Sequence, residues 1–128
     1  HLLRILRLGK FVVQEGEKNI IRLTAKGRRR AHAYAIKQLQ IKKPKKWDGK
    51  WRIVIFDIPE VKKRLRDELR RRLKLLGFIE FQKSVFVHPY SCEDEINILV
   101  NFFGLHENVR CLESTLSYDA DLRQTFKL

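Results

Sequence analysis

The chain has 128 residues, of which 44% are hydrophobic and 34% are charged, so it can bury the core of one domain that carries an appendage. It contains no run of 18 apolar residues and no apolar signal segment, so we expect neither a membrane span nor a secretory signal. Its two cysteines, Cys92 and Cys111, form no CxxC pair, which predicts reduced thiols and a cytoplasmic location.

The positive charge is concentrated in the first part of the chain. The net charge is +13; residues 1–50 contain 15 Lys/Arg against 3 Asp/Glu, whereas residues 51–128 contain 13 against 12. A concentrated basic segment attracts a polyanion, most often nucleic acid, through contacts with phosphates. The alternative is a basic surface that only contributes to solubility. The chain begins at His1 and contains no methionine, so we expect it to be a piece of a longer protein.

The first 49 residues predict a small unit followed by a linker. Residues 1–9 have the pattern of the last turns of a helix, and residues 10–23 predict a hairpin around a polar turn. Thr24 is expected to cap a following helix rich in Ala, Lys and Arg. The lysine-rich stretch 42–49, which contains a proline and a glycine, predicts a linker, so the N-terminal element is placed at residues 1–41.

Residues 50–117 alternate regularly between strand and helix patterns. The stretch WRIVIFDI is apolar on both faces, as a central strand is. Residues 60–76 predict a helix that ends at Gly77, and its buried stripe would contain Val61, Leu65, Leu69, Leu73 and Leu76.

Two strands, a helix and a last strand follow. FIEFQ and SVFVH predict two strands separated by Lys83, and VRCLESTL predicts the final strand. Between SVFVH and VRCLESTL, Ser91 and Asp94 have the spacing of a capping box for a helix that ends at Gly104. This helix is expected to bury Ile96, Leu99, Val100 and Phe103. The order β-α-β-β-α-β predicts an α+β protein with a ferredoxin-like core. The tail at residues 118–128 can add a turn of helix that packs Leu122 and Phe126.

Asp57 stands out because it closes the apolar strand WRIVIF and precedes Pro59 by two residues. Strand ends of this kind often meet a functional crevice. One carboxylate binds Mg²⁺ poorly, but two copies of Asp57 that meet across a dimer axis could share one ion. The competing interpretation is that Asp57 accepts backbone N–H bonds at the start of the following helix.

The candidate phosphate contacts come from the basic N-terminal part and the linker. They are Lys18, Arg28, Arg29, Arg30, Lys42, Lys43, Lys45 and Lys46. The basic face of the helix at 62–74 is instead interpreted as a solvated face, because an amphipathic helix needs a polar outer side. Phe81 and Phe86 could stack on RNA bases, but core packing is the better interpretation.

The sequence offers little support for other chemistry. His32, His88 and His106, together with the two cysteines, do not have the spacing of zinc ligands and are interpreted as structural. No Ser/His/Asp order, Gly-rich phosphate loop or HExxH motif occurs, so nucleophilic catalysis and nucleotide hydrolysis are not expected.

Two motifs resemble those of a known family. FDIPE after a strand, and QKSVFV with Gln82, Ser84, Val85 and Phe86, are similar to the second CRISPR-associated (Cas) protein, the small adaptation subunit. The same core forms the central domain of PaaX-type transcriptional repressors, where a winged helix precedes it. IIRLTAKGRRRA is similar to the wing and the next helix of such a domain, and LLRILRLGKF to the end of its recognition helix. The resemblance covers about residues 1–40 and 50–117.

The resemblance implies a homodimer with a ferredoxin-like core and a partial winged helix. In the CRISPR family the aspartates that match Asp57 approach each other and can hold a divalent metal such as Mg²⁺. Some members are metal-dependent endonucleases, and others serve as a scaffold beside the integrase. This chain has about fifty residues before its first core strand, which free-standing CRISPR subunits do not have.

These observations favour a DNA-binding transcriptional regulator of the PaaX type, with DNA preferred over RNA as its partner. A CRISPR adaptation scaffold that binds an integrase is the second hypothesis. The third is a Mg²⁺-dependent endonuclease that uses paired Asp57 carboxylates, with Mg²⁺ as its cofactor. Whether the protein is an enzyme is left open by the sequence.

Overall fold

The computed structural model describes residues 12–15 and 20–128, which divide into two compact units at residues 1–39 and 40–128. Each unit is considered by itself. No helix within the described ranges combines the length and the apolar character needed to cross a membrane.

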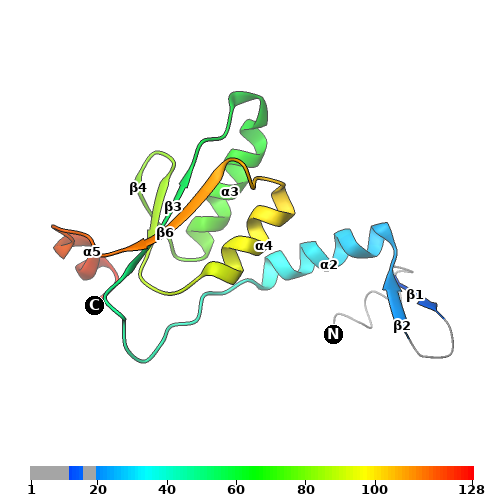
Figure 1. The fold of residues 1–128 in the computed structure, drawn as a ribbon, viewed down its shortest axis with the longest axis horizontal. Helices are drawn as coiled ribbons and strands as arrows, with labels where there is room; N and C mark the ends of the chain where they lie inside the picture. Colours follow the sequence, from blue (N-terminus) through cyan, green and yellow to red (C-terminus); the bar gives the residue numbers. More distant parts are fainter. Residues whose placement is uncertain (1–11, 16–19) are drawn as a thin grey trace. The chain divides into compact units, whose positions relative to one another are not determined.

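Within its described residues, the N-terminal unit contains a hairpin followed by a helix (Figure 1). Strands β1 (Val12–Glu15) and β2 (Ile20–Leu23) pair antiparallel, and helix α2 (Ala25–Gln38) follows. The Thr24 hydroxyl accepts a 2.9 Å bond from the backbone N–H of Gly27, which satisfies one of the free donors at the helix start. The predicted hairpin and Thr24 cap are therefore confirmed. The predicted helix end at residues 1–9 and the turn at 16–19, with Lys18, lie outside the described residues.

The second unit is an α+β arrangement around a four-stranded antiparallel sheet, as predicted (Figure 1). The strand order is β4-β5-β3-β6, so β3 is an inner strand with neighbours on both edges. Helices α3 and α4 contact each other on one side of this sheet, and α5 ends the chain. The elements are β3 (Trp51–Phe56), the 3₁₀ turn η1 (Glu60–Lys62), α3 (Lys63–Leu75), β4 (Ile79–Gln82), β5 (Val85–His88), α4 (Glu93–Phe103), β6 (Val109–Ser114) and α5 (Ala120–Thr125).

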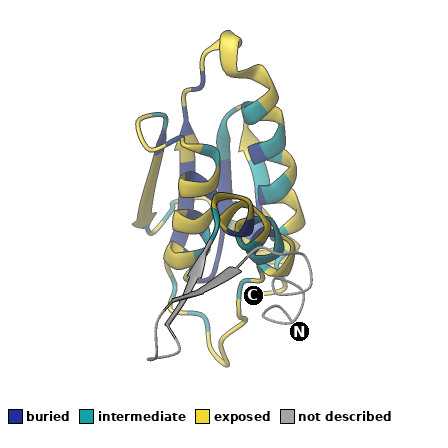
Figure 2. Ribbon diagram, turned by 90° about the vertical axis from the view of Figure 1, so that its right-hand side faces the viewer, coloured by how far each residue is buried: buried dark blue, intermediate teal, exposed yellow. Residues whose placement is uncertain are grey.

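Burial follows the two sides of the sheet (Figure 2). On the helix side, α3 buries Leu69 and Leu73, and α4 buries Leu99, all with at most 1% of their surface exposed. On the other side, Leu122 of α5 completes a cluster with Trp51, Ile53 and Val87, against which Trp47, Val85, Leu116 and Phe126 pack. The predicted role of Leu122 and Phe126 in the tail is confirmed.

Two local predictions about helix starts are wrong. Val61 lies in η1 and is 89% exposed, because a 3₁₀ turn has three residues per turn and does not continue the stripe of the α-helix behind it. Helix α4 begins after Cys92, which makes no side-chain cap bond, so Ser91 lies one position too early for a capping box. The acids Glu93, Asp94 and Glu95 occupy the first turn of α4 instead and favour its dipole.

The predicted helix ends are confirmed. Gly77 follows α3 with φ +98°, and Gly104 ends α4 with φ +64°, a left-handed conformation that glycine adopts without strain. Ile96, Leu99 and Val100 are buried as predicted, whereas Phe103 is only half-buried.

Candidate nucleic-acid interface

The first turns of α2 present three adjacent cations. Arg28, Arg29 and Arg30 are all exposed, and none makes an ion pair with any residue that the structure describes. Successive residues of an α-helix differ by about 100°, so the three side chains spread over more than half of the helix circumference. Helix α2 contains no acidic residue. The helix itself therefore supplies no carboxylate to neutralise these three arginines.

The lysines of the predicted linker are exposed as well, but acids lie beside them. Lys42, Lys43 and Lys45 line a hollow of about 640 Å³ together with Ser91, Asp94 and Glu95. Lys46 is exposed and lies outside this hollow. Because carboxylates reduce the positive potential around the first three lysines, we expect these lysines to attract phosphate less strongly than the arginines of α2.

Asp57 lies directly after β3 and is held by its backbone. Its N–H donates to the carbonyl of Asn108 (2.8 Å), and its own carbonyl accepts from Asn108 Nδ2 (3.0 Å). The carboxylate is exposed, and it makes no hydrogen bond or ion pair with the part of the chain that the structure describes. The interpretation of Asp57 as a helix cap is wrong, because neither η1 nor α3 has a side-chain cap bond.

The motif residues around Asp57 are brought together by strand pairing. Val85 lies opposite Ile55, and Phe86 lies opposite Val54. The carbonyl of Ser84 accepts the N–H of Phe56 (3.1 Å), so the turn between β4 and β5 lies beside the end of β3. The motifs FDIP and QKSVFV, far apart in sequence, thus form one end of the sheet.

The residues of the QKSVFV motif differ in burial and in backbone conformation. Phe86 is fully buried and stacks on Phe56, with ring centroids 5.7 Å apart. Ser84 has a left-handed backbone (φ +70°) and Gln82 is exposed. Core packing is therefore confirmed for Phe86 but is wrong for Phe81, which is 53% exposed where a bulge interrupts the pairing of β4 with β5.

Most cations of α3 are paired with acids. Glu68 binds Arg71 and Arg72, and Glu80 binds Arg70 and Lys74, at N···O distances between 2.6 and 3.3 Å. These contacts lower the pKa of both carboxyls, mainly through the hydrogen bonds of Arg71 to Glu68 and of Arg70 to Glu80. Near the start of the helix, Lys62, Lys63 and Arg64 are exposed and make no ion pair with described residues.

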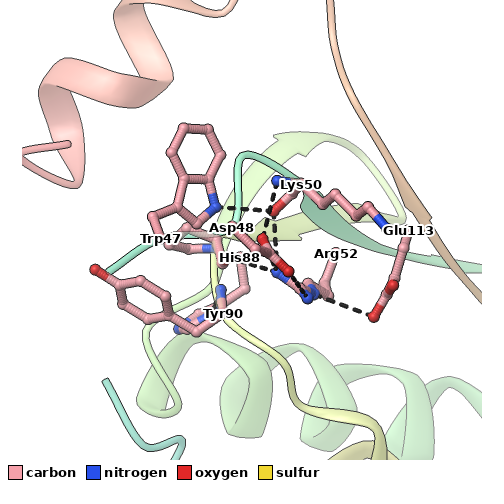
Figure 3. Close-up of polar contacts among 8 residues, drawn as sticks. Trp47, Asp48, Lys50, Arg52, His88, Tyr90 and Glu113 are labelled. Atoms are coloured by element: carbon pink, nitrogen blue, oxygen red, sulfur yellow. Dashed lines mark hydrogen bonds and ion pairs between the residues drawn. The ribbon is translucent and has the colours of Figure 1, made fainter. Parts of the chain in front are cut away.

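The most connected charged residue of the second unit, Arg52, was missed by the sequence interpretation (Figure 3). Arg52 lies in β3 and is only 8% exposed. Its Nη1 and Nη2 bind both carboxylate oxygens of Asp48 at 2.9 and 2.6 Å, and its Nε donates to Glu113 at 3.2 Å. Nη1 also donates to the carbonyls of Lys50 (3.0 Å) and Pro89 (2.8 Å). We call Arg52 and these four partners the Arg52 network.

The Arg52 network ties the end of the predicted linker to the sheet. The paired guanidinium lowers the pKa of Asp48 to about 2. Trp47 donates from its indole N–H to the carbonyl of Lys50 (2.9 Å), and its ring lies 5.0 Å from that of Trp51. The Arg123 guanidinium lies 4.8 Å from the centre of the Trp47 ring. A sequence signal existed, since an arginine inside a buried strand requires an acid, and Asp48 lies four residues earlier.

His88 and Cys92 are buried next to this network. Nδ1 of His88 accepts the N–H of Tyr90 (3.1 Å), and the ring contacts Phe78 and Phe126. Burial lowers the pKa of His88 to about 4 and raises that of the Cys92 thiol to about 12. Among the described residues, no three His, Cys, Asp or Glu side chains are grouped so that they could hold a metal ion.

A comparison with protein families gives one match. The family model described as the PaaX protein central Cas2-like domain matches residues 44–125, well over half of the chain. The matched range contains the Arg52 network, Asp57 and the QKSVFV motif. A comparison with curated proteins finds no match.

Proposed function

The chain belongs to the PaaX family through its central Cas2-like domain, and we propose that it is a homodimeric, DNA-binding transcriptional regulator of the PaaX type. In this proposal the sheet unit is a ferredoxin-like core, which the order β-α-β-β-α-β and the strand order β4-β5-β3-β6 support. The hairpin and α2 are the wing and the next helix of a winged-helix domain. A cytoplasmic location belongs to the same proposal.

The observation that carries the proposal is that the arginines of α2 are not paired with described acids, whereas most cations of α3 are. Arg28, Arg29 and Arg30 are exposed and unpaired within the described residues, whereas the cations in the middle of α3 are bound by Glu68 and Glu80. Unpaired exposed cations can replace the counterions of a nucleic-acid backbone, which gives affinity without sequence preference. The arginines of α2 are the principal phosphate contacts in this proposal, with Lys18, Lys42, Lys43, Lys45 and Lys46 as weaker ones.

The experiment replaces Arg28, Arg29 and Arg30 together by glutamine and measures binding to labelled DNA duplexes of unrelated sequence between 50 and 200 mM salt. We expect affinity to fall about equally for all duplexes, and the salt slope to decrease by about 0.9 for each phosphate that the variant no longer neutralises. The matched control replaces Lys62, Lys63 and Arg64 by glutamine, which removes the same charge from the end of η1 and the first turn of α3. Unchanged binding of the first variant at low salt, or an equal loss in the control, contradicts the assignment. An RNA duplex of the same sequence tests the preference for DNA.

Support for a homodimer comes from apolar side chains on the side of the sheet away from α3 and α4. Ile55 and Leu112 are 40% and 41% exposed there, and strand alternation places Asp57 on the same side as Ile55. A second copy would cover these side chains. We expect Leu112→Glu to shift the protein toward monomer in sedimentation experiments, whereas Ile98→Glu, at a similarly exposed position on α4, leaves the oligomeric state unchanged. Equal behaviour of the two variants contradicts this interface.

The competing function is a Mg²⁺-dependent endonuclease, and its supporting observation is the exposed carboxylate of Asp57, which pairs with none of the described residues. A single chain does not provide a Mg²⁺ site, because Mg²⁺ requires several oxygen ligands. Among the described residues, no three His, Cys, Asp or Glu side chains are grouped to supply them. The function therefore depends on two Asp57 residues meeting in a dimer. Cleavage by the parent protein that is lost in Asp57→Asn, with binding retained, supports the endonuclease; no cleavage by the parent removes it. Co-purification with an integrase would instead indicate the CRISPR scaffold role.

A further inference from the structure

A cleft of about 340 Å³ lies between α4 and the edge strand β6. Its size is that of a site for a small organic molecule. On the α4 side of the sheet, Val54 and Ile96 supply apolar side chains, and Glu93, Asn97 and Glu113 supply polar side chains. The cleft lies wholly within the unit formed by residues 40–128.

The charged side chains of this cleft that are not fully paired are carboxylates, although the chain as a whole has a net charge of +13. Glu93 makes no ion pair or side-chain hydrogen bond with the described residues. Glu113 is bound only through Oε1, at 3.2 Å from Arg52 Nε, and half of its side chain is exposed. The one cation that lines the cleft, Arg52, already donates to four residues. An anionic ligand would therefore meet two carboxylates and a guanidinium that is engaged elsewhere.

A buried thiol in the wall gives a second indication of a binding site. Cys92 lines the cleft and is only 4% exposed, and its thiol makes no hydrogen bond within the described residues. Because burial raises its pKa to about 12, the thiol is neutral at physiological pH. The buried part of the cleft thus contains a neutral thiol beside the fully engaged guanidinium of Arg52, and the carboxylates of Glu93 and Glu113 are more exposed.

We propose that the α4–β6 cleft binds a small ligand that carries a primary ammonium group on a short branched apolar chain. The apolar chain contacts Val54 and Ile96. An ammonium group has three N–H donors, and the cleft offers three side-chain acceptors in Glu93, Glu113 and the amide oxygen of Asn97. A charge-assisted contact of this kind is about twice as strong as a neutral one.

The proposal has a consequence for the linker, because Arg52 belongs both to the cleft and to the Arg52 network. An ammonium group at Glu113 competes with Arg52 Nε for the same carboxylate. Arg52 also shares the carbonyl of Lys50 with the indole N–H of Trp47, so a shift of Arg52 is transmitted to Trp47. The chain has only two tryptophans, Trp47 and Trp51, and both adjoin this network. Their fluorescence therefore reports on ligand binding.

The test uses three probes of the same shape with the ¹⁵N-labelled chain: 3-methylbutylamine, 3-methylbutanoate and 3-methylbutan-1-ol. We expect the amine to shift the amide resonances of residues 92–97 and 111–113 and to change the tryptophan fluorescence. The acid and the alcohol should bind at least about tenfold more weakly. Absence of amine-induced shifts at these residues, or equal binding of the alcohol, overturns the proposal.

Two variants with the same charge change separate a local contact from general electrostatics. Glu93→Gln should weaken amine binding several-fold without altering the fold, because Glu93 has no partner to lose within the described residues. Glu107→Gln removes an exposed acid that does not line the cleft, and it should leave amine affinity within about twofold of the parent. Equal weakening in both variants overturns the assignment of the ammonium to this cleft.

Discussion

The two parts of the chain use positive charge in opposite ways. In the unit at residues 40–128, Arg52 is buried and binds Asp48, Glu113 and two carbonyls, so its charge holds the structure together. In α2, Arg28, Arg29 and Arg30 are exposed and bind no described residue. The net charge of +13 therefore does not show by itself which cations can bind a phosphate. Whether a cation stabilises the fold or is available to a phosphate depends on burial and on local acids.

The largest effect is expected from Arg52→Met. The variant leaves the carbonyl of Pro89 without its donor and removes the ion pair of Asp48, so the free energy of unfolding should fall by about 3 kcal/mol. Urea unfolding followed by tryptophan fluorescence measures this loss. Arg71→Met is the matched control, because Arg71 forms an exposed pair with Glu68, so its loss should lower the free energy of unfolding far less than Arg52→Met does. Similar losses in both variants would show that burial does not distinguish the two arginines.

The next largest effect is a decrease of the free energy of unfolding at low pH that is caused by His88. Its folded pKa of about 4 lies below the ordinary value of 6.5, so the unfolded chain takes up the proton first as the pH falls. Stability is therefore full above about pH 6.5 and is lost as the pH decreases toward 4. Between pH 6.5 and 4.5, before most carboxylates titrate, the loss should be roughly 2 kcal/mol.

The control for this pH dependence is His88→Gln, whose side-chain oxygen can still accept the N–H of Tyr90. The variant is less stable at neutral pH, but its unfolding free energy should decrease much less between pH 6.5 and 4.5 than that of the parent, since only carboxyls such as Glu68 and Glu80 begin to titrate there. A slope equal to that of the parent would assign the pH dependence to another group. Below about pH 4 both proteins should lose the contribution of Asp48, whose pKa of about 2 lies below its ordinary 3.8.

The sequence predicted those parts of the fold that depend on local patterns. The apolar run of β3, the stripe of Leu69 and Leu73, and the glycine ends of both helices follow from periodicity and backbone freedom. The predictions for Val61 and Ser91 were wrong because the start of a helix depends on the backbone conformation of one or two residues, which periodicity does not determine.

The candidate site was predictable only in part. The exposed arginines of α2 and the strand-end Asp57 could be found from residue type and position alone. Of the Arg52 network, only the contact with Asp48, four residues away, had a signal in the sequence, because Pro89 and Glu113 lie 37 and 61 residues away from Arg52 in the chain. Phe81 and Phe86 looked alike in sequence, and only the bulge in β4 separates an exposed ring from a buried one.

A smaller effect is expected at the turn of the QKSVFV motif. Ser84 adopts φ +70°, which costs an L-residue roughly 1 kcal/mol, so Ser84→Gly should raise the unfolding free energy by up to about 1 kcal/mol. Ser91→Gly is the control, since Ser91 has no positive φ and should lose stability instead. If Ser84 served nucleic acid as the α2 arginines are proposed to do, Ser84→Gly would also weaken DNA binding. We expect its DNA affinity to remain within about twofold of the parent.

The smallest effect on stability is expected where the effect on binding is largest. Replacing Arg28, Arg29 and Arg30 by glutamine removes no ion pair within the described residues, and glutamine has nearly the helix propensity of arginine. The helical signal of the variant in circular dichroism, and its melting, should therefore match the parent to within about 0.5 kcal/mol. Tryptophan fluorescence does not suffice here, because both tryptophans lie in the second unit. A variant that binds DNA weakly and also loses its helix would mean that these arginines stabilise α2, and the contrast with Arg52 would disappear.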